Sequence, residues 1–223
     1  MTAMGRIVSV NVGMPREHGT PGAADPMDRP WTTGFFKEPV EGPVRVRTLN
    51  LDGDGQADLR VHGGVDKAIL AYSADHYPLW REELGINDLP HGAFGENFTI
   101  AGLDERTVCV GDVWQIGDQV RVEVSQPRQP CWKLARRWRR PDLPQRVLEN
   151  GRSGWYFRVL TEGQVIAGLA LTLQERPFPR WTIAEATDVR LHRPHDQRAN
   201  AELAGLSPLA ESWRSALRKR LGT

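Results

Sequence analysis

A cysteine flanked by prolines and cations is the stretch of this sequence with the clearest chemical content. Residues 125–133 read SQPRQPCWK, so Cys131 lies three residues after Arg128 and two before Lys133. Nearby cations favour the thiolate over the thiol, and a thiolate is both a nucleophile and a ligand for soft metals. The prolines fix φ and remove backbone donors, which predicts a rigid turn that leaves a strand. A buried cysteine acting as a small apolar side chain is the alternative that local features leave open.

Two glycines between basic residues form a second candidate site. Residues 61–68 read VHGGVDKA, which places His62 and Lys67 on either side of Gly63 and Gly64. Glycine reaches positive φ, and the N–H groups of such residues can form a concave nest for an anion. The stretch therefore predicts a phosphate cradle, with a Gly-Gly hairpin turn and a surface lysine as the alternative.

A third group of residues lies where a glycine-rich turn meets an apolar run. Gly95, Glu96 and Asn97 occupy this junction, and the junction of a loop with a strand often carries binding groups. The acidic turn at 52–56 begins like a calcium-binding loop, but Gly63 stands at the twelfth position. Calcium loops place a bidentate glutamate there, so we do not expect a calcium site.

The elements that must position these residues are mainly short strands. Apolar runs and alternation of apolar and polar residues predict strands at 6–12, 44–51, 68–72, 98–100, 108–116, 119–125, 155–160, 164–167 and 170–173. Eight or nine short strands separated by turn signals predict a β-barrel. Residues 13–33 collect Gly, Pro, Asp and His and predict a long mobile loop. Short helices are expected at 75–84, 133–138 and 144–150.

The chain changes character after the last predicted strand. Three helices are expected there, from a capping box at 182–185, over 199–203, and from the Ser207-Pro208 pair to residue 221. We therefore expect a mostly β domain over residues 1–175 and a small three-helix domain over residues 176–223.

Composition bounds the class of protein and of partner. The 223 residues carry 29 Lys and Arg against 28 Asp and Glu, so the overall charge favours neither nucleic acid nor anionic membranes. The basic residues near the C-terminus of the last helix suit the helix dipole and are accompanied by acids, so nucleic-acid binding is not expected. The sequence has no apolar run of about 18 residues and no secretory leader, which predicts a cytoplasmic protein without a membrane partner. Two cysteines without a Cys-x-x-Cys pair predict neither a disulfide framework nor a structural zinc site.

Four motifs occur in the order in which a known family carries them. They are residues 61–68, the FGEN of residues 94–97, Gly111-Asp112, and the SQPRQPC of residues 125–131. Through these motifs residues 5–175 resemble MOSC-domain proteins, especially the bacterial YiiM type. The trailing helices resemble the three-helix appendage of that type. The resemblance implies a β-barrel-like MOSC fold with a few short helices.

The resemblance also implies binding of the molybdenum cofactor (molybdopterin). Cys131 would be the protein ligand to molybdenum and the catalytic residue, since a soft thiolate suits that metal. The residues implied in holding the cofactor and its phosphate are His62, Gly63, Gly64, Lys67, Arg128 and, from the long loop, Lys37, with Gly95, Glu96 and Asn97 at motif positions that either bind or only hold the pocket in shape.

YiiM-like proteins are linked to reduction of N-hydroxylated compounds, including hydroxylamino-purine base analogues, to amines. The resemblance thus implies a molybdenum-cofactor-dependent oxidoreductase in detoxification. Its electrons would come from an external donor protein, because the sequence shows no flavin, dinucleotide or iron–sulfur motif. The C-terminal helices could dock that donor or cover the site.

Two other functions remain open at this stage. In one, the same cysteine carries a persulfide or passes the cofactor to another enzyme, without turnover of its own. In the other, the protein is a hydrolytic cysteine enzyme, although no Cys–His pair can be read from the sequence. The sequence also leaves the oligomeric state open, and a homodimer is compatible with it.

Overall fold

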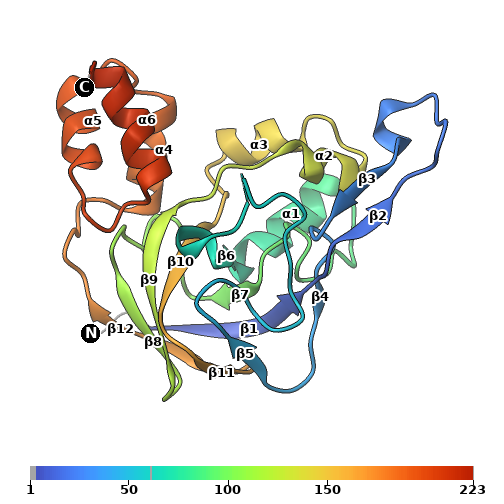
Figure 1. Cartoon of the computed structure of the whole chain (residues 1–223), viewed down its shortest axis with the longest axis horizontal. Helices are drawn as coiled ribbons and strands as arrows, with labels where there is room; N and C mark the ends of the chain where they lie inside the picture. Colours follow the sequence, from blue (N-terminus) through green and yellow to red (C-terminus); the bar gives the residue numbers. More distant parts are fainter. Residues whose placement is uncertain (1–3, 61, 223) are drawn as a thin grey trace.

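Seven strands close into a barrel in the computed structural model, which describes residues 4–60 and 62–222 (Figure 1). In ring order they are β12 (Ala170–Glu175), β8 (Val113–Ile116), β9 (Val120–Pro127), β10 (Trp155–Thr161), β6 (Ile69–Ser73), β7 (Phe98–Ala101) and β1 (Met4–Val12). β1 pairs back with β12, which closes the ring. Neighbouring strands are antiparallel except for the parallel pair β6 and β7. The predicted mostly β, barrel-like fold is confirmed, and Val61 of the second motif lies outside the described residues.

Short strands and helices decorate the barrel. Strand β4 (Glu38–Pro39) pairs with the end of β1, while β2 (Arg16–His18) pairs with β3 (Trp31–Thr33), and β5 (Val44–Val46) with β11 (Gly163–Val165). The helices beside the barrel are α1 (Tyr77–Leu84), α2 (Trp132–Trp138) and α3 (Leu143–Glu149), with short 3-10 turns η1 (Pro26–Asp28), η2 (Val65–Lys67) and η3 (Ala74–His76). The C-terminal helices are α4 (Ile183–Leu191), α5 (Gln197–Ala204) and α6 (Glu211–Leu221).

The predicted long loop at 13–33 is wrong in part, because β2 and β3 form a hairpin there. Each strand has only three residues, too few for an alternating pattern to be read. The predicted strand at 44–51 ends early for a similar reason. Only Val44–Val46 is a strand, and a turn then brings Leu51 back to Val46 as an isolated bridge.

The third C-terminal helix begins later than predicted. Helix α6 starts at Glu211, with Ala210 as its N-cap. The expected capping pair lies in a turn instead, where the Pro208 carbonyl accepts a hydrogen bond from Arg158 at 3.3 Å. The proline also packs on the barrel, since a Cβ added to Gly111 would lie 2.6 Å from its ring. A tertiary contact therefore uses the residues that looked like a local cap.

Two groups of buried apolar side chains hold the fold together. The larger group fills the barrel and includes Ile7, Trp114 and Phe157. It continues without interruption into the C-terminal helices, where Leu203 and Trp213 belong to it. Each fully buried large apolar side chain contributes on the order of 1.5–3 kcal/mol to stability. The barrel and the helices thus share one core.

The smaller apolar group lies under α1, α2 and α3. Tyr72, Trp80, Phe94, Leu134 and Leu143 are among its fully buried members. This group anchors the helix that follows Cys131. No helix in the described part of the chain combines the length and the apolar character that crossing a membrane requires.

Candidate functional site

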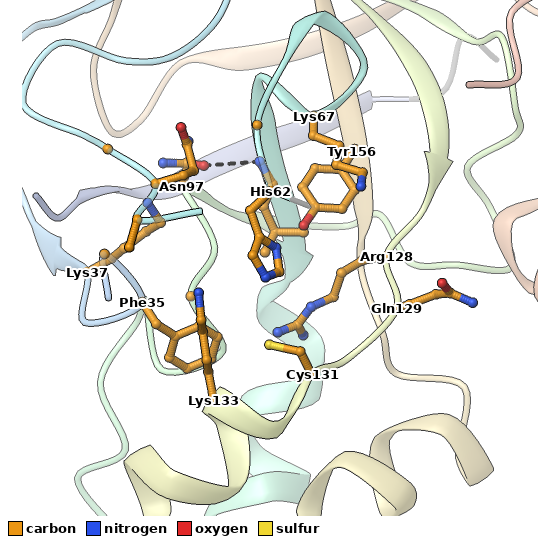
Figure 2. Close-up of a pocket in the computed structure, with 17 residues that line it drawn as sticks. Phe35, Lys37, His62, Lys67, Asn97, Arg128, Gln129, Cys131, Lys133 and Tyr156 are labelled. Carbon is orange, nitrogen blue, oxygen red and sulfur yellow. Dashed lines mark hydrogen bonds between the residues drawn. The ribbon is translucent and has the colours of Figure 1, made fainter. Parts of the chain in front are cut away.

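One pocket collects most of the residues that the sequence singled out (Figure 2). It holds about 590 Å³ of space between atoms, part of it open to solvent. The predicted residues that line it are Lys37, His62, Gly63, Lys67, Gly95, Asn97, Arg128 and Cys131. They come from segments far apart in the chain, so the barrel brings them together.

Cys131 lies at the N-cap of α2, with extended backbone angles of φ −123° and ψ 169°. β9 ends at Pro127, and the four residues between strand and helix form the turn that the prolines predicted. The thiol is free and half-buried. Figure 2 shows its sulfur on the same side of the pocket as the Arg128 guanidinium and the His62 ring. The alternative of a fully buried, inert cysteine does not hold for Cys131.

Arg128 is a buried cation held by backbone carbonyl groups. Its side chain donates to the Phe94 carbonyl at 2.8 Å and to the Ser153 carbonyl at 3.4 Å, and only 3% of the residue is exposed. The backbone N–H of Arg128 donates to the Gly154 carbonyl at 3.0 Å. Carbonyl groups fix the guanidinium without neutralising its charge, and among the described residues no carboxylate forms an ion pair with it. Arg128 therefore contributes a fixed positive charge to the wall.

The charge of the pocket wall is positive. Its charged side chains are Lys37, Lys67, Arg128 and Lys133, and no carboxylate lines it among the described residues. Burial, with the positive charges of Lys133, Lys67 and Arg128, lowers the pKa of His62 to about 4. The imidazole is thus neutral at pH 7. Such a wall attracts an anionic ligand.

Lys37 and Asn97 form a polar layer at one side of the pocket. The buried Lys37 ammonium makes an ion pair with Asp54, whose other oxygen accepts a hydrogen bond from the Asn97 amide at 2.9 Å. Asn97 also accepts from the Leu70 N–H at 3.1 Å and donates to the Asn11 carbonyl at 3.3 Å. Asp54 offsets the Lys37 charge, so the net positive charge of the wall rests on the other cations.

Two predicted site residues do not line the pocket. The Glu96 carboxylate is fully buried and accepts hydrogen bonds from the N–H groups of Gly92 at 2.8 Å and Phe94 at 3.1 Å. It also accepts from the hydroxyls of Thr99 and Tyr77. Its oxygens are therefore used to fix the turn that carries Gly95, which makes Glu96 a positioning residue.

Gly64 is the second predicted site residue that does not line the pocket. It has φ +82° and is the N-cap of η2, and its carbonyl accepts from the Lys67 N–H at 3.0 Å. Its neighbour Gly63, at φ +98°, does line the pocket. The two glycines thus have the positive φ that the sequence predicted, and only the first of them faces the cavity.

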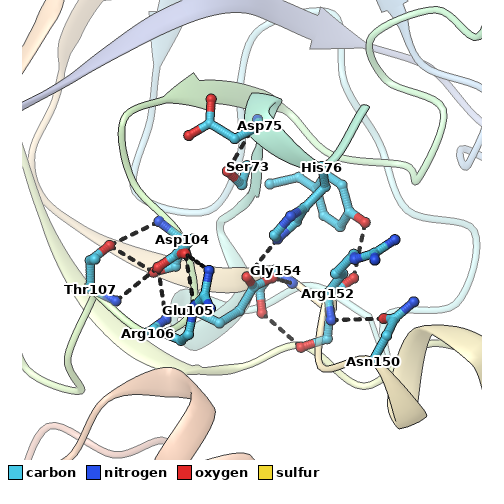
Figure 3. Close-up of polar contacts among 12 residues, drawn as sticks. Ser73, Asp75, His76, Asp104, Glu105, Arg106, Thr107, Asn150, Arg152 and Gly154 are labelled. Atoms are coloured by element: carbon cyan, nitrogen blue, oxygen red, sulfur yellow. Dashed lines mark hydrogen bonds and ion pairs between the residues drawn. The ribbon is translucent and has the colours of Figure 1, made fainter. Parts of the chain in front are cut away.

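A buried network behind Arg128 was not foreseen from the sequence (Figure 3). One Glu105 oxygen lies 2.7 Å from the His76 Nε2, and the other accepts from the Gly154 N–H at 2.6 Å. The Gly154 carbonyl in turn accepts from the Arg128 N–H. A lone glutamate in a loop carries no local signal, so only the fold shows that Glu105 supports the wall. We call Arg128, which lines the cavity, together with Glu105, His76, Ser153 and Gly154, which support it from outside the lining, the floor of the pocket.

The families that match the sequence agree with this arrangement. Residues 58–172 match the MOSC domain, a stretch that holds the two glycines, the buried turn and Cys131. Residues 181–223 match the YiiM-like three-helix domain. The chain belongs to the MOSC family. MOSC domains are associated with binding of the molybdenum cofactor.

Several members of the family are similar over most of the chain. The Bacillus subtilis protein YflK is 40% identical over 214 residues, which cover 96% of this chain and 93% of YflK. The crystal structure of YiiM from Geobacillus stearothermophilus matches with a TM-score of 0.80 and 39% identity, over 97% of this chain and 99% of that one. A Gibberella moniliformis protein named Reductase is 35% identical over 194 residues, which cover 85% of this chain and 34% of that protein.

The side chains of the pocket fit both parts of such a cofactor. Cys131 offers one soft sulfur ligand for molybdenum. Lys67, Arg128 and Lys133 offer positive charge for a phosphate, and Gly63 lets the backbone approach it closely. The donor set of this chain is therefore suited to a soft metal and to an anion in the same pocket.

Proposed function

We propose that this protein is a molybdenum-cofactor-dependent reductase that converts N-hydroxylated compounds, of the hydroxylamino-purine type, to amines. The observation that carries the proposal is the half-buried Cys131 thiol in a pocket whose charged wall residues are all cationic. Membership of the MOSC family and the relative named Reductase support it.

The overall reaction is R–NHOH plus two electrons and two protons giving R–NH2 and water, in which the N–O bond breaks. The bound cofactor supplies two-electron redox chemistry at its metal. We propose an external protein as the electron source, acting in the cytoplasm on a detoxification reaction.

The side chains of the pocket would divide the remaining tasks. Cys131 holds the metal, while Arg128 and Lys67 hold the phosphate. His62 is neutral at pH 7, so one ring nitrogen donates a hydrogen bond and the other accepts one. A neutral imidazole can therefore orient the N–OH group of the substrate, which carries both a donor and an acceptor.

An anaerobic turnover assay tests the proposal. Protein purified from a host that makes the cofactor is mixed with 6-hydroxylaminopurine and a chemical reductant, and adenine is measured by chromatography against a protein-free blank. We expect many turnovers for the wild type and for Cys109→Ala, and none above the blank for Cys131→Ala. Cys109 is the matched control because it is buried, lies outside the pocket lining and has its pKa raised by burial to about 11. Release of one equivalent of sulfur or cofactor without turnover would contradict the reductase and favour a carrier.

A further inference from the structure

A second hollow adjoins the cofactor pocket on the side of the β2–β3 hairpin. Its lining residues are Trp31, Thr32, Ala57, Asp58, His62, Trp132 and Lys133. Ala57, His62 and Lys133 also line the first pocket, so the two hollows are neighbours that share part of their walls. We call Trp31, Trp132 and Arg136 the mouth of the pocket.

The mouth presents two indole rings that line the second hollow. The ring centroids of Trp31 and Trp132 lie 5.1 Å apart at an interplanar angle of 53°. Trp132 is 53% exposed, although burial of such a large apolar surface would be favourable. It directly follows Cys131, so the Cα atoms of the two residues lie about 3.8 Å apart across a trans peptide bond. Trp132 lines this second hollow and Cys131 lines the first, and His62 and Lys133 lie between the two.

Arg136 holds the two indoles in place. Its guanidinium lies 4.8 Å from the Trp31 ring centroid and 5.5 Å from that of Trp132. It also donates to the Met27 carbonyl at 3.0 Å and to the Arg29 carbonyl. These bonds tie the segment before β3 to α2, so the rings are arranged before any ligand arrives. Rigid aromatic side chains bind at a low cost in conformational entropy.

We propose that the Trp31–Trp132 pair is the substrate subsite and stacks a flat heteroaromatic ring that carries the hydroxylamino group. This inference rests on the proposed function, which places the reacting metal at Cys131. Asp58 and Lys133 lie at the edge of the same hollow. The Lys133 ammonium can donate a hydrogen bond to a ring nitrogen of such a heterocycle, whereas the Asp58 carboxylate is already paired with the Arg60 guanidinium. Stacking on the indoles then leaves the hydroxylamino group free to point toward the thiol, and small aliphatic hydroxylamines gain nothing from this subsite.

Steady-state kinetics with two substrates tests the subsite in the loaded enzyme. For Trp132→Ala we expect kcat/KM for 6-hydroxylaminopurine to fall about ten- to hundredfold, mainly through KM, because stacking on one aromatic side chain is worth about that factor. The kcat/KM for N-methylhydroxylamine stays within about twofold. Trp132→Phe retains a ring and restores most of the loss. Leu79→Ala is the matched control, since Leu79 is another exposed apolar side chain, 44% exposed on α1.

Two results would overturn the subsite while the reductase activity stands. One is an equal loss of kcat/KM for both substrates, together with a loss of bound pterin, because the indoles would then stack the cofactor. The other is no loss for either substrate.

A binding measurement separates the subsite from the proposed function. Adenine, the product, is titrated into the cofactor-free protein while tryptophan fluorescence is followed. We expect saturable quenching in the wild type and its loss in Trp132→Ala. If the loaded wild type reduced neither substrate, the proposed function would fail, and this titration would still test the subsite. No saturable quenching in the wild type would overturn the subsite.

Discussion

The floor and the mouth of the pocket differ in how their side chains are satisfied. At the floor, Arg128 and Glu105 are buried and their polar atoms bind backbone groups of other loops. At the mouth, Trp132 exposes half of its surface, and Arg136 connects it to a hairpin of three-residue strands. Figure 1 shows that this hairpin projects from the barrel on the side away from the C-terminal helices.

The floor and the mouth are therefore suited to different ligands. A floor with fixed charges suits a cofactor that must stay in one position, because preorganised groups need no rearrangement when it binds. A mouth with exposed rings suits a ligand that enters and leaves in each turnover. If this division is right, substitutions at the floor affect the whole fold, while substitutions at the mouth affect local structure and substrate binding.

The largest expected effect is at the floor, from Glu105→Ala. The change leaves the Gly154 N–H and the His76 ring without their buried partner. We expect the free energy of unfolding to fall by roughly 2–4 kcal/mol, measured by urea denaturation. The control is Glu175→Ala, whose carboxylate pairs with Arg121 on the surface and is expected to cost about 0.5 kcal/mol or less. If Glu105→Ala and Glu175→Ala lost the same free energy of unfolding, the buried contacts of the floor would contribute no more to stability than a surface ion pair.

The next expected effect tests the positive charge of the pocket wall. Burial is the main cause that lowers the pKa of His62 to about 4, and Lys133 contributes most among the charged neighbours, so Lys133→Gln should raise that pKa part of the way toward 6.5. The imidazole titration is followed by NMR, with Lys219→Gln on the last helix as the control. Inorganic phosphate bound in the pocket should also raise the pKa of His62, because an anion favours the charged ring. An unchanged titration in Lys133→Gln would remove Lys133 from the site.

This depressed pKa also sets a pH dependence of stability. The unfolded chain takes up a proton on His62 as the pH falls through about 6.5, whereas the folded chain does so only near pH 4. The contribution of the neutral His62 ring to the free energy of unfolding is therefore full above pH 6.5 and is lost as the pH falls toward 4. Because Lys133→Gln raises the pKa of His62 in the folded chain, the pH range over which this stability is lost should become narrower, with its lower limit above pH 4.

The smallest expected effect is at the mouth, from Arg136→Ala. The variant loses the bonds to the Met27 and Arg29 carbonyls, and we expect a loss of about 1 kcal/mol or less in the free energy of unfolding. Hydrogen exchange should accelerate at residues 25–33 and not in the barrel strands. Arg140→Ala is the control, since Arg140 binds the Leu84 carbonyl away from the hairpin. Exchange that accelerates across the whole barrel would contradict a mouth whose local stability is independent of the barrel.

The part of the site that is local in sequence could be predicted, and the part built by the fold could not. The prolines, Arg128 and Cys131 form a continuous stretch whose turn geometry follows from their side chains. Glu105, in contrast, contacts residues 29 and 49 positions away, and nothing near it indicates that role. For Glu96 the sequence left open whether it binds the cofactor or only holds the pocket in shape, and its carboxylate accepts hydrogen bonds from the turn, which favours the second role.

The same distinction holds for the fold. Alternation and apolar runs predicted the strands of the barrel, although the strand predicted at 108–116 is formed only over Val113–Ile116. The capping box predicted the start of α4, where the Thr182 hydroxyl accepts from the Glu185 N–H at 3.0 Å. The link between the barrel and the C-terminal helices depends on the shared core and on the bond from the Ala210 N–H to the Ser125 carbonyl at 2.9 Å. Such long-range contacts leave no periodic trace in the sequence.

The most direct test of the account is the molybdenum and pterin content of the purified protein. Wild type, Cys131→Ala and Cys109→Ala are prepared side by side from a host that makes the cofactor, and metal is measured by mass spectrometry and pterin by fluorescence after oxidation. We expect near-stoichiometric molybdenum in the wild type and in Cys109→Ala, and its loss in Cys131→Ala. An undiminished metal content in Cys131→Ala, or no metal in the wild type even after cofactor is added back, would contradict the assignment of Cys131 as the ligand.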